Sequence, residues 1–313
     1  MMKTPSAVLQ PESRFGQLWW QHVAQHPWTA AGLTLTMALV LLLLWQSASQ
    51  LSTEGISTAA GYGLLGGAAG FAGTALGALP ALVLRQLPQQ VEDALLGAAA
   101  GMMLAASAFS LLLPGLAAAE NLVNHPMAGA GIVVLGMTLG VLLMLGLDQF
   151  TPHEHPQTGP CGPGYQRCSR VWLFVFAIAL HNLPEGMAIG VAFSQGDIAV
   201  GLPLATAIAL QDIPEGLAVA LALRNAGFRP VLAVMVAAAS GLLEPIGAIV
   251  GLGLSSGLAI SYPIGLGLAA GAMLFVVSHE VIPETHRHGH QTAATLGLMV
   301  GFALMMVLDT TLG

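Results

Sequence analysis

Long apolar stretches alternate with short polar segments along the chain after its first 27 residues. Each stretch has about 20 residues or more, the length that a helix needs to cross a hydrocarbon core about 30 Å thick. The pattern predicts nine helical spans, at about 28–48, 58–84, 93–118, 127–147, 171–194, 198–223, 230–254, 262–283 and 291–311. We therefore expect an all-α fold, a polytopic membrane helix bundle.

The first span differs from the others in what surrounds it. Residues 1–27 are polar and too long for the charged region of a typical signal peptide. The span carries Trp28 and Trp45 near its ends, and tryptophan is enriched at membrane–water interfaces. Although Ser47–Ser49 has the small residues of a cleavage site, we interpret the span as an extra, uncleaved N-terminal transmembrane helix. The eight later spans then form one domain over 58–313.

Every basic residue falls on one side of the predicted bundle. The eight are Lys3, Arg14, Arg85, Arg167, Arg170, Arg224, Arg229 and Arg287. Because loops rich in Lys and Arg stay in the cytoplasm, this side is cytoplasmic. The N-terminus is then cytoplasmic, and the C-terminus lies on the periplasmic or extracellular side of an inner (plasma) membrane. So few basic residues leave no electrostatic footprint for nucleic acid.

Composition supports a bundle of closely packed helices. The chain is 55% hydrophobic and 7% charged, whereas soluble domains carry about 25% charged residues. Its 39 glycines favour close helix contacts in lipid. An internal repeat joins GAAAGMML at 97–104 to GLAAGAML at 267–274, on spans that run in opposite directions. Inverted repeats with a site near the membrane midplane are typical of transporters.

Two near-identical motifs carry most of the chemistry, HNLPEG at 181–186 and QDIPEG at 211–216. They lie on consecutive spans, where a buried Glu costs about 2.5–3.5 kcal/mol on insertion scales. Residues i, i+3 and i+4 share a helix face, so each motif aims three ligand-capable groups to one side. The six are His181, Asn182, Glu185, Gln211, Asp212 and Glu215. We also expect Pro184 and Pro214 to bend their helices and expose carbonyls.

Glu244, followed by Pro245 on the seventh span, adds a further carboxylate. The four acids Glu185, Asp212, Glu215 and Glu244 can neutralise two divalent ions. Imidazole combined with carboxylate suits zinc and similar first-row metals, whereas an all-oxygen set would favour calcium or magnesium. The sequence therefore predicts a metal site within the membrane.

Other polar residues outline a path on either side of this site. Ser110 and Asp309, near the outer ends of their spans, form the predicted entrance. The predicted exit contains Asp93, His153, His155, His279, Glu280 and His286, with Glu92, Glu284, His288 and His290 close by. His153 and His155 belong to a cytoplasmic loop at 148–170, which we expect to be flexible. We interpret its Cys161 and Cys168 as free thiols. The alternatives are a transient metal contact and a disulfide, which a cytoplasmic loop disfavours.

The paired motifs resemble those of the ZIP (Zrt-/Irt-like protein) family of divalent metal transporters, in a bacterial-type member. The resemblance covers about 58–313. It implies eight helices in a 3+2+3 arrangement with inverted symmetry, to which this chain adds its first helix. It also implies import of zinc toward the cytosol, with cadmium, iron or manganese as other substrates. The metal is the substrate, and no organic cofactor is expected.

Residue by residue, the resemblance implies two adjacent metal positions. The first is formed by His181, Glu185, Gln211 and Glu215. The second is formed by Asn182, Asp212 and Glu244, with Glu185 and Glu215 bridging the two. Met103 is carried over as a further ligand from the small-residue motif around it. The second motif begins with Gln211 where many members have His, a difference that bears on metal preference.

The sequence leaves other functions open beside alternating access. A selective metal channel would use the same ligands, and protonated acids acting only as polar contacts between helices would need no metal. An intramembrane zinc protease would need H-E-x-x-H on a helix. Neither His279-Glu280 nor His153-Glu154 completes that motif, so no catalytic residue is assigned. Divalent ions and the lipid bilayer are the expected partners, and the sequence does not decide between a monomer and a homodimer.

Overall fold

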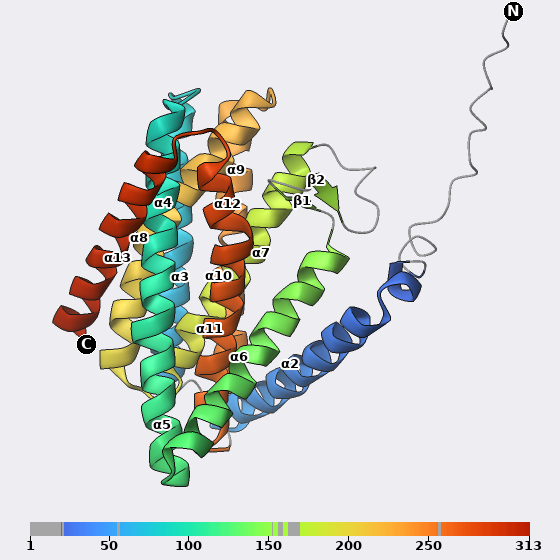
Figure 1. The fold of residues 1–313 in the computed structure, drawn as a ribbon, viewed down its shortest axis with the longest axis vertical. Helices are drawn as coiled ribbons and strands as arrows, with labels where there is room; N and C mark the ends of the chain where they lie inside the picture. Colours follow the sequence, from blue (N-terminus) through green and yellow to red (C-terminus); the bar gives the residue numbers. More distant parts are fainter. Residues whose placement is uncertain are drawn as a thin grey trace, which may run out of the picture.

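The computed structural model describes residues 20, 22–54, 57–151, 153–155, 159–161, 170–255 and 258–313. Within these ranges, eight helical segments are long and apolar enough to cross a membrane. They are Thr58–Leu82, Gln89–Val123, Pro126–Phe150, Val175–Phe193, Ile198–Asn225, Pro230–Leu254, Ser261–His286 and Gln291–Leu312. They coincide with the last eight apolar runs of the sequence. The predicted all-α membrane bundle is confirmed, and Figure 1 shows its helices side by side.

Most spans are single helices, and some are built from two. The first half contains α2 (Pro27–Glu54), α3 (Thr58–Ala78), α4 (Gln89–Ala106), α5 (Leu113–Val123) and α6 (Pro126–Phe150). The second half contains α7 (Arg170–Phe193), α8 (Ile198–Asn225), α9 (Pro230–Ser240), α10 (Leu243–Leu254), α11 (Ser261–Val276), α12 (Ile282–His286) and α13 (Gln291–Leu312). A 3₁₀ turn at Leu79–Leu82 ends the α3 span.

The predicted extra helix is present as α2, which is longer than the apolar run 28–48. It lies at the edge of the bundle beside α6 (Figure 1) and also packs against α10. Gly146 of α6 admits Leu33 of α2 to close contact. Nε2 of His22 lies 2.8 Å from the backbone oxygen of Gln149, so the N-terminal segment is tied to the end of α6. That α2 crosses the membrane stays a prediction.

The loop between α6 and α7 contains a short hairpin. Strands β1 (His153–His155) and β2 (Gly159–Cys161) pair antiparallel, with His153 opposite Cys161. This hairpin is an addition to the all-α pattern that the apolar runs did not indicate. The flexibility that we expect of this loop stays a prediction. Cys168 lies outside the described residues.

The predicted repeat is visible in how α4 and α11 pack. Gly97 and Gly101 of α4 lie directly against backbone carbonyls of α13, and Gly267 and Gly271 of α11 lie against backbone carbonyls of α6. Since lipid offers no hydrophobic force between helices, close backbone approach at small residues is what holds them together. The two copies of the repeat therefore use the same glycines for equivalent contacts.

Each copy of the repeat is also followed by a π-helical turn. These turns span Ser107–Leu112, after α4, and Val277–Val281, after α11. Both begin ten residues after the first glycine of their copy. A π-turn inserts one extra residue into the helix and is frequent at functional sites. In each copy, this extra residue therefore changes the direction in which the side chains after the repeated glycines point.

The predicted span 230–254 is broken, contrary to our expectation of one helix. Helix α9 ends at Ser240, and α10 begins at Leu243. Pro245 lacks the N–H that would bond to the carbonyl of Gly241, and its ring crowds that carbonyl. The break places Glu244 in the first turn of α10. In contrast, α7 and α8 continue through Pro184 and Pro214 without interruption.

Candidate metal centre

The polar residues of both motifs are buried inside the bundle. Their exposed fractions, with that of Glu244, are 4% for His181, 2% for Asn182, 0% for Glu185, 0% for Gln211, 1% for Asp212, 3% for Glu215 and 0% for Glu244. They come from α7, α8 and α10. Helical spacing places the members of each motif on one face, and both faces turn inward. The sequence therefore located these side chains correctly in the interior.

Three carboxylates converge within this buried region. One oxygen each of Glu185, Asp212 and Glu215 lies within 4.8 Å of the others. Two oxygens that bind one zinc ion at about 2.0–2.2 Å are separated by no more than about 4.4 Å. The three acids are thus close to coordination distance of a shared ion. Like charges this close repel strongly in a low-dielectric interior unless a cation or protons join them.

Hydrogen bonds account for only part of the cluster. Gln211 Nε2 donates to Glu185 Oε1 at 2.5 Å, and Thr74 Oγ1 donates to Glu244 Oε1 at 2.8 Å. Seven other buried oxygens find no hydrogen-bond partner among the described residues: Glu185 Oε2, Gln211 Oε1, both of Asp212, both of Glu215 and Glu244 Oε2. Buried polar atoms are nearly always bonded. Apart from a hydrogen bond that the carboxyls of Asp212 and Glu244 can share when one is protonated, these acceptors face no donor among the described residues, which favours a cation site.

Helix α3 completes the site, and the sequence argument missed it. Its Thr74 bonds to Glu244, and its Gly70 leaves space that the Glu244 carboxylate occupies. A Cβ on Gly70 would overlap Glu244 Oε2 and lie 3.1 Å from Asp212 Oδ2. The helical spacing of Gly66, Gly70 and Gly73 was the available signal, because such a stripe marks a face that another group approaches closely.

The glycine that ends each motif has a packing role. Gly186 lies against the backbone carbonyl of Glu244, and Gly216 lies against the backbone carbonyl of Thr74. A side chain at either position would push away the helix that carries the next polar group of the site. Each Pro-Glu-Gly sequence therefore combines a candidate ligand, the Glu, with a Gly that lets the neighbouring helix approach closely.

For two further predicted ligands, Met103 and His181, the structure shows contacts to groups other than the three clustered carboxylates. Met103 is fully buried in the main apolar core, together with Met187 and Met273. His181 Nε2 lies 3.0 Å from Glu280 Oε2 on the π-turn after α11. The structure thus joins Glu280, which the sequence placed near the inner end of its span, directly to a motif residue.

The predicted entrance residues meet each other. Ser110 Oγ donates to Asp309 Oδ1 at 2.7 Å, across 199 positions of sequence. Ser110 belongs to the π-turn after α4, and Asp309 is near the end of α13. The sequence placed both at outer span ends without indicating that they bond.

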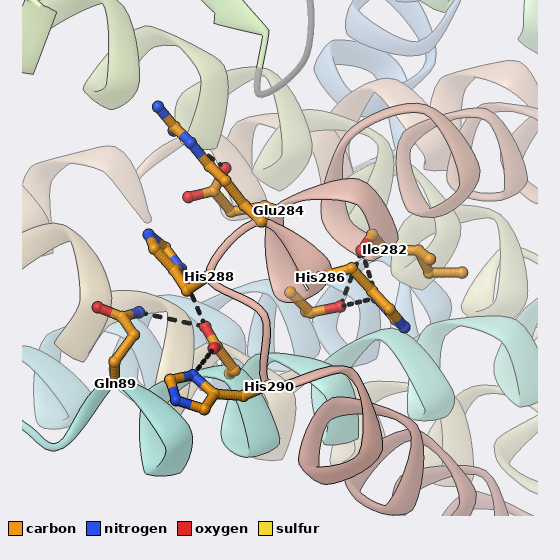
Figure 2. Close-up of polar contacts among 9 residues, drawn as sticks. Gln89, Ile282, Glu284, His286, His288 and His290 are labelled. Atoms are coloured by element: carbon orange, nitrogen blue, oxygen red, sulfur yellow. Dashed lines mark hydrogen bonds and ion pairs between the residues drawn. The ribbon is translucent and has the colours of Figure 1, made fainter.

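The predicted exit residues form several small groups. Nδ1 of His288 and Nδ1 of His290 lie 3.3 and 2.9 Å from the two oxygens of the Asp93 carboxylate. Figure 2 shows both imidazole rings directed at one carboxylate. Gln89 Nε2 donates to the same carboxylate at 3.1 Å. Asp93 is 1% exposed. The buried carboxylate therefore connects the start of α4 to the turn before α13.

The remaining exit residues have other neighbours. Nδ1 of His286 lies 2.9 Å from the carbonyl oxygen of Ile282 (Figure 2), and the ring of His279 lies 4.9 Å from that of Phe275. His153 and His155 belong to β1, which packs against α7. The predicted exit residues thus come from four elements: α4, the π-turn after α11, α12 and β1.

A comparison with known protein families decides the family to which the chain belongs. The family described as ZIP Zinc transporter matches residues 149–309, about half of the chain, including both motifs and Glu244. The chain belongs to the ZIP family. ZIP proteins are transporters, so membership removes the protease alternative and establishes a multi-pass membrane protein.

Named relatives cover most of the chain. Zinc transporter ZIPB of Bordetella bronchiseptica is 62% identical, over 97% of this chain and 99% of the relative. Zinc transporter GufA of Myxococcus xanthus is 41% identical, over 81% of this chain and 100% of the relative. Human zinc transporter ZIP11 is 31% identical, over 77% of this chain and 94% of the relative. These alignments support a bacterial-type ZIP protein with a full-length transporter core.

Proposed function

We propose that this ZIP protein imports zinc into the cytoplasm through the acidic cluster between α7, α8 and α10. The observation that carries the proposal is the set of seven buried oxygens that find no donor among the described residues. Zinc binds carboxylate and imidazole, and a cation removes the cost of burying several like charges. Zinc transport by the named relatives adds support.

Two adjacent metal positions fit the cluster. The first uses His181, Glu185, Gln211 and Glu215, with Met103 beside it. The second uses Asn182, Asp212 and Glu244. Bridging by Glu185 and Glu215 is supported by their separation, since both belong to the group within 4.8 Å. Cadmium, iron and manganese are further substrates of this donor set.

Charge supports the proposed topology. The basic residues that the sequence predicts at one end of the bundle favour a cytoplasmic position for that end, in a cell whose inner membrane holds the protein. Zinc then enters past Ser110 and Asp309 and leaves past Glu280 toward Asp93. A tight site built from several carboxylates releases zinc slowly unless the protein moves, so alternating access fits better than a channel. We assign this transport to the domain over 58–313, with α2 as a ninth span. A homodimer is compatible with this arrangement.

Zinc uptake by the purified full chain tests this function. Proteoliposomes with an internal zinc-sensitive dye should show uptake that saturates with external zinc, and His181→Ala should reduce it strongly. A slow zinc uptake rate that saturates would indicate a carrier. Uptake that rises without saturation at channel-like speed would contradict alternating access, and absence of zinc uptake by oriented, folded protein would contradict zinc transport.

The entrance pair gives a separate prediction. Asp309→Ala removes the carboxylate that attracts the cation and accepts the Ser110 hydrogen bond. We expect the KM for zinc uptake to rise about fivefold at low ionic strength and the rise to shrink as salt screens the charge. Thr310→Ala, at an exposed neighbour on the same helix, is the matched control. An unchanged KM at low salt would remove Asp309 from the entrance.

A further inference from the structure

His181 is engaged outside the acidic cluster in this structure. Its Nε2 lies 3.0 Å from Glu280 Oε2, and both side chains are 5% exposed. Among the described residues, the group of mutually close ligand atoms contains Glu185, Asp212 and Glu215 but not His181. His181 and Glu185 are nevertheless one turn apart on the same face of α7. The imidazole therefore lies beside the cluster, close enough to Glu215 to interact with its charge, and its Nε2 contacts Glu280.

The contact to Glu280 and coordination of zinc through Nε2 exclude each other. A neutral imidazole carries its hydrogen on one nitrogen and a lone pair on the other. While Nε2 donates that hydrogen to a carboxylate, it has no lone pair for a metal. Zinc bound through Nε2 needs that lone pair, so the contact to Glu280 must break and the ring hydrogen must move to Nδ1. Zinc bound through Nδ1 would instead keep the contact to Glu280. Because Glu280 is a buried carboxylate, the bond being broken is charge-assisted and about twice as strong as a neutral one.

The π-turn after α11 sets the position of Glu280. Glu280 is thirteen residues after Gly267, the first glycine of the second repeat copy, and Ser110 is thirteen residues after Gly97 in the first copy. Both residues lie within their π-turns, and both bond to a different helix: Ser110 to Asp309 and Glu280 to His181. The repeat thus directs one polar side chain per copy into a contact between helices.

We propose that Glu280 is a positioning residue that competes with the metal for His181. In the metal-free protein Glu280 holds the imidazole beside the cluster. When zinc binds, His181 leaves Glu280 and becomes a ligand, and Glu280 takes the imidazole back as zinc departs. The competition weakens equilibrium binding and speeds release, which a carrier needs. The inference rests on the proposed function and assigns Glu280 a role in that same site.

Measurements of zinc affinity and uptake rate test whether Glu280 competes with zinc for His181. In Glu280→Gln the contact to His181 becomes a neutral hydrogen bond, so the competition weakens. We expect zinc to bind the purified full chain about fivefold more tightly, measured against a competing chelating dye. The maximal rate of uptake into proteoliposomes should fall severalfold together with KM. Glu280→Asp, which keeps the charge, should return both values toward wild type. Glu120→Gln, on an exposed residue of α5, removes one negative charge elsewhere and should change neither.

A double variant tests whether Glu280 acts through His181. In the His181→Ala background, Glu280→Gln should leave zinc affinity unchanged, because the competing imidazole is absent. Weaker or equal zinc binding by Glu280→Gln alone would overturn the inference, as would the same gain in affinity in both backgrounds. If Glu280→Gln unfolds in metal-free buffer, Glu280→Ala takes its place, and wild-type zinc affinity with an unchanged uptake rate in Glu280→Ala would also overturn the inference. Failure of the wild type to take up zinc would contradict the proposed function itself.

Discussion

Glu185→Gln is expected to reduce zinc uptake by about 100-fold or more while leaving the metal-free protein at least as heat-stable as wild type. Altering groups that only support metal ligands costs about 10–100-fold, and Glu185 bridges both proposed positions. The substitution keeps the volume of the side chain and an oxygen that accepts the hydrogen bond from Gln211. It removes a buried charge whose second oxygen has no partner among the described residues. Binding is lost, and no stabilising contact is lost with it.

Two measurements on one preparation check this expectation. Initial zinc uptake gives the functional loss, and thermal unfolding in the presence of a chelator gives the stability. Glu120→Gln provides the same change of charge at an exposed position and should match wild type in both. Uptake within twofold of wild type would contradict the assignment of Glu185 as a ligand. Loss of uptake with a marked fall in unfolding temperature would indicate a structural role instead.

Gly70→Ala is the second substitution with a large expected effect, although Gly70 carries no ligand atom. A Cβ at this position overlaps the carboxylate of Glu244 and lies 3.1 Å from Asp212 Oδ2. Both acids belong to the second proposed metal position, so both must move. We expect zinc affinity to fall about tenfold or more and the folded state to lose about 1–3 kcal/mol, the usual cost of overpacking a closely packed site.

Gly61→Ala on the same helix is the matched control for Gly70→Ala. A Cβ on Gly61 meets no atom within 4 Å, and alanine favours the helix by about 1 kcal/mol over glycine. We therefore expect this variant to bind zinc as wild type does, with equal or greater stability. Wild-type zinc binding by Gly70→Ala would show that α3 does not limit the space of the centre.

The location of the centre was predictable because helical spacing alone determines which side chains share a face. His181 and Glu185 had to lie together, as did Asp212 and Glu215, and no apolar environment accepts such residues unless they face one another. The span pattern was equally predictable, since apolar length is dictated by bilayer thickness. The repeat was visible because Gly97 and Gly267 serve the same kind of contact.

Other features depend on contacts that helical spacing cannot encode. Thr74 is an ordinary helix residue until α3 approaches α10, where it bonds to Glu244. The π-turn that holds Glu280 has no sequence signature of its own, so a residue assigned to the end of a span proved to contact His181. The break before Glu244 follows from Pro245, yet Pro184 and Pro214 leave their helices continuous.

Zinc X-ray absorption on the metal-loaded, purified full chain tests the central claim most directly. The account predicts nitrogen and oxygen neighbours at about 2.0–2.2 Å, with an imidazole contribution from His181 that disappears in His181→Ala. It also predicts two zinc ions per chain in wild type and fewer in Glu185→Gln. Sulfur neighbours at about 2.3 Å from the loop cysteines, with a zinc content that Glu185→Gln does not change, would contradict it.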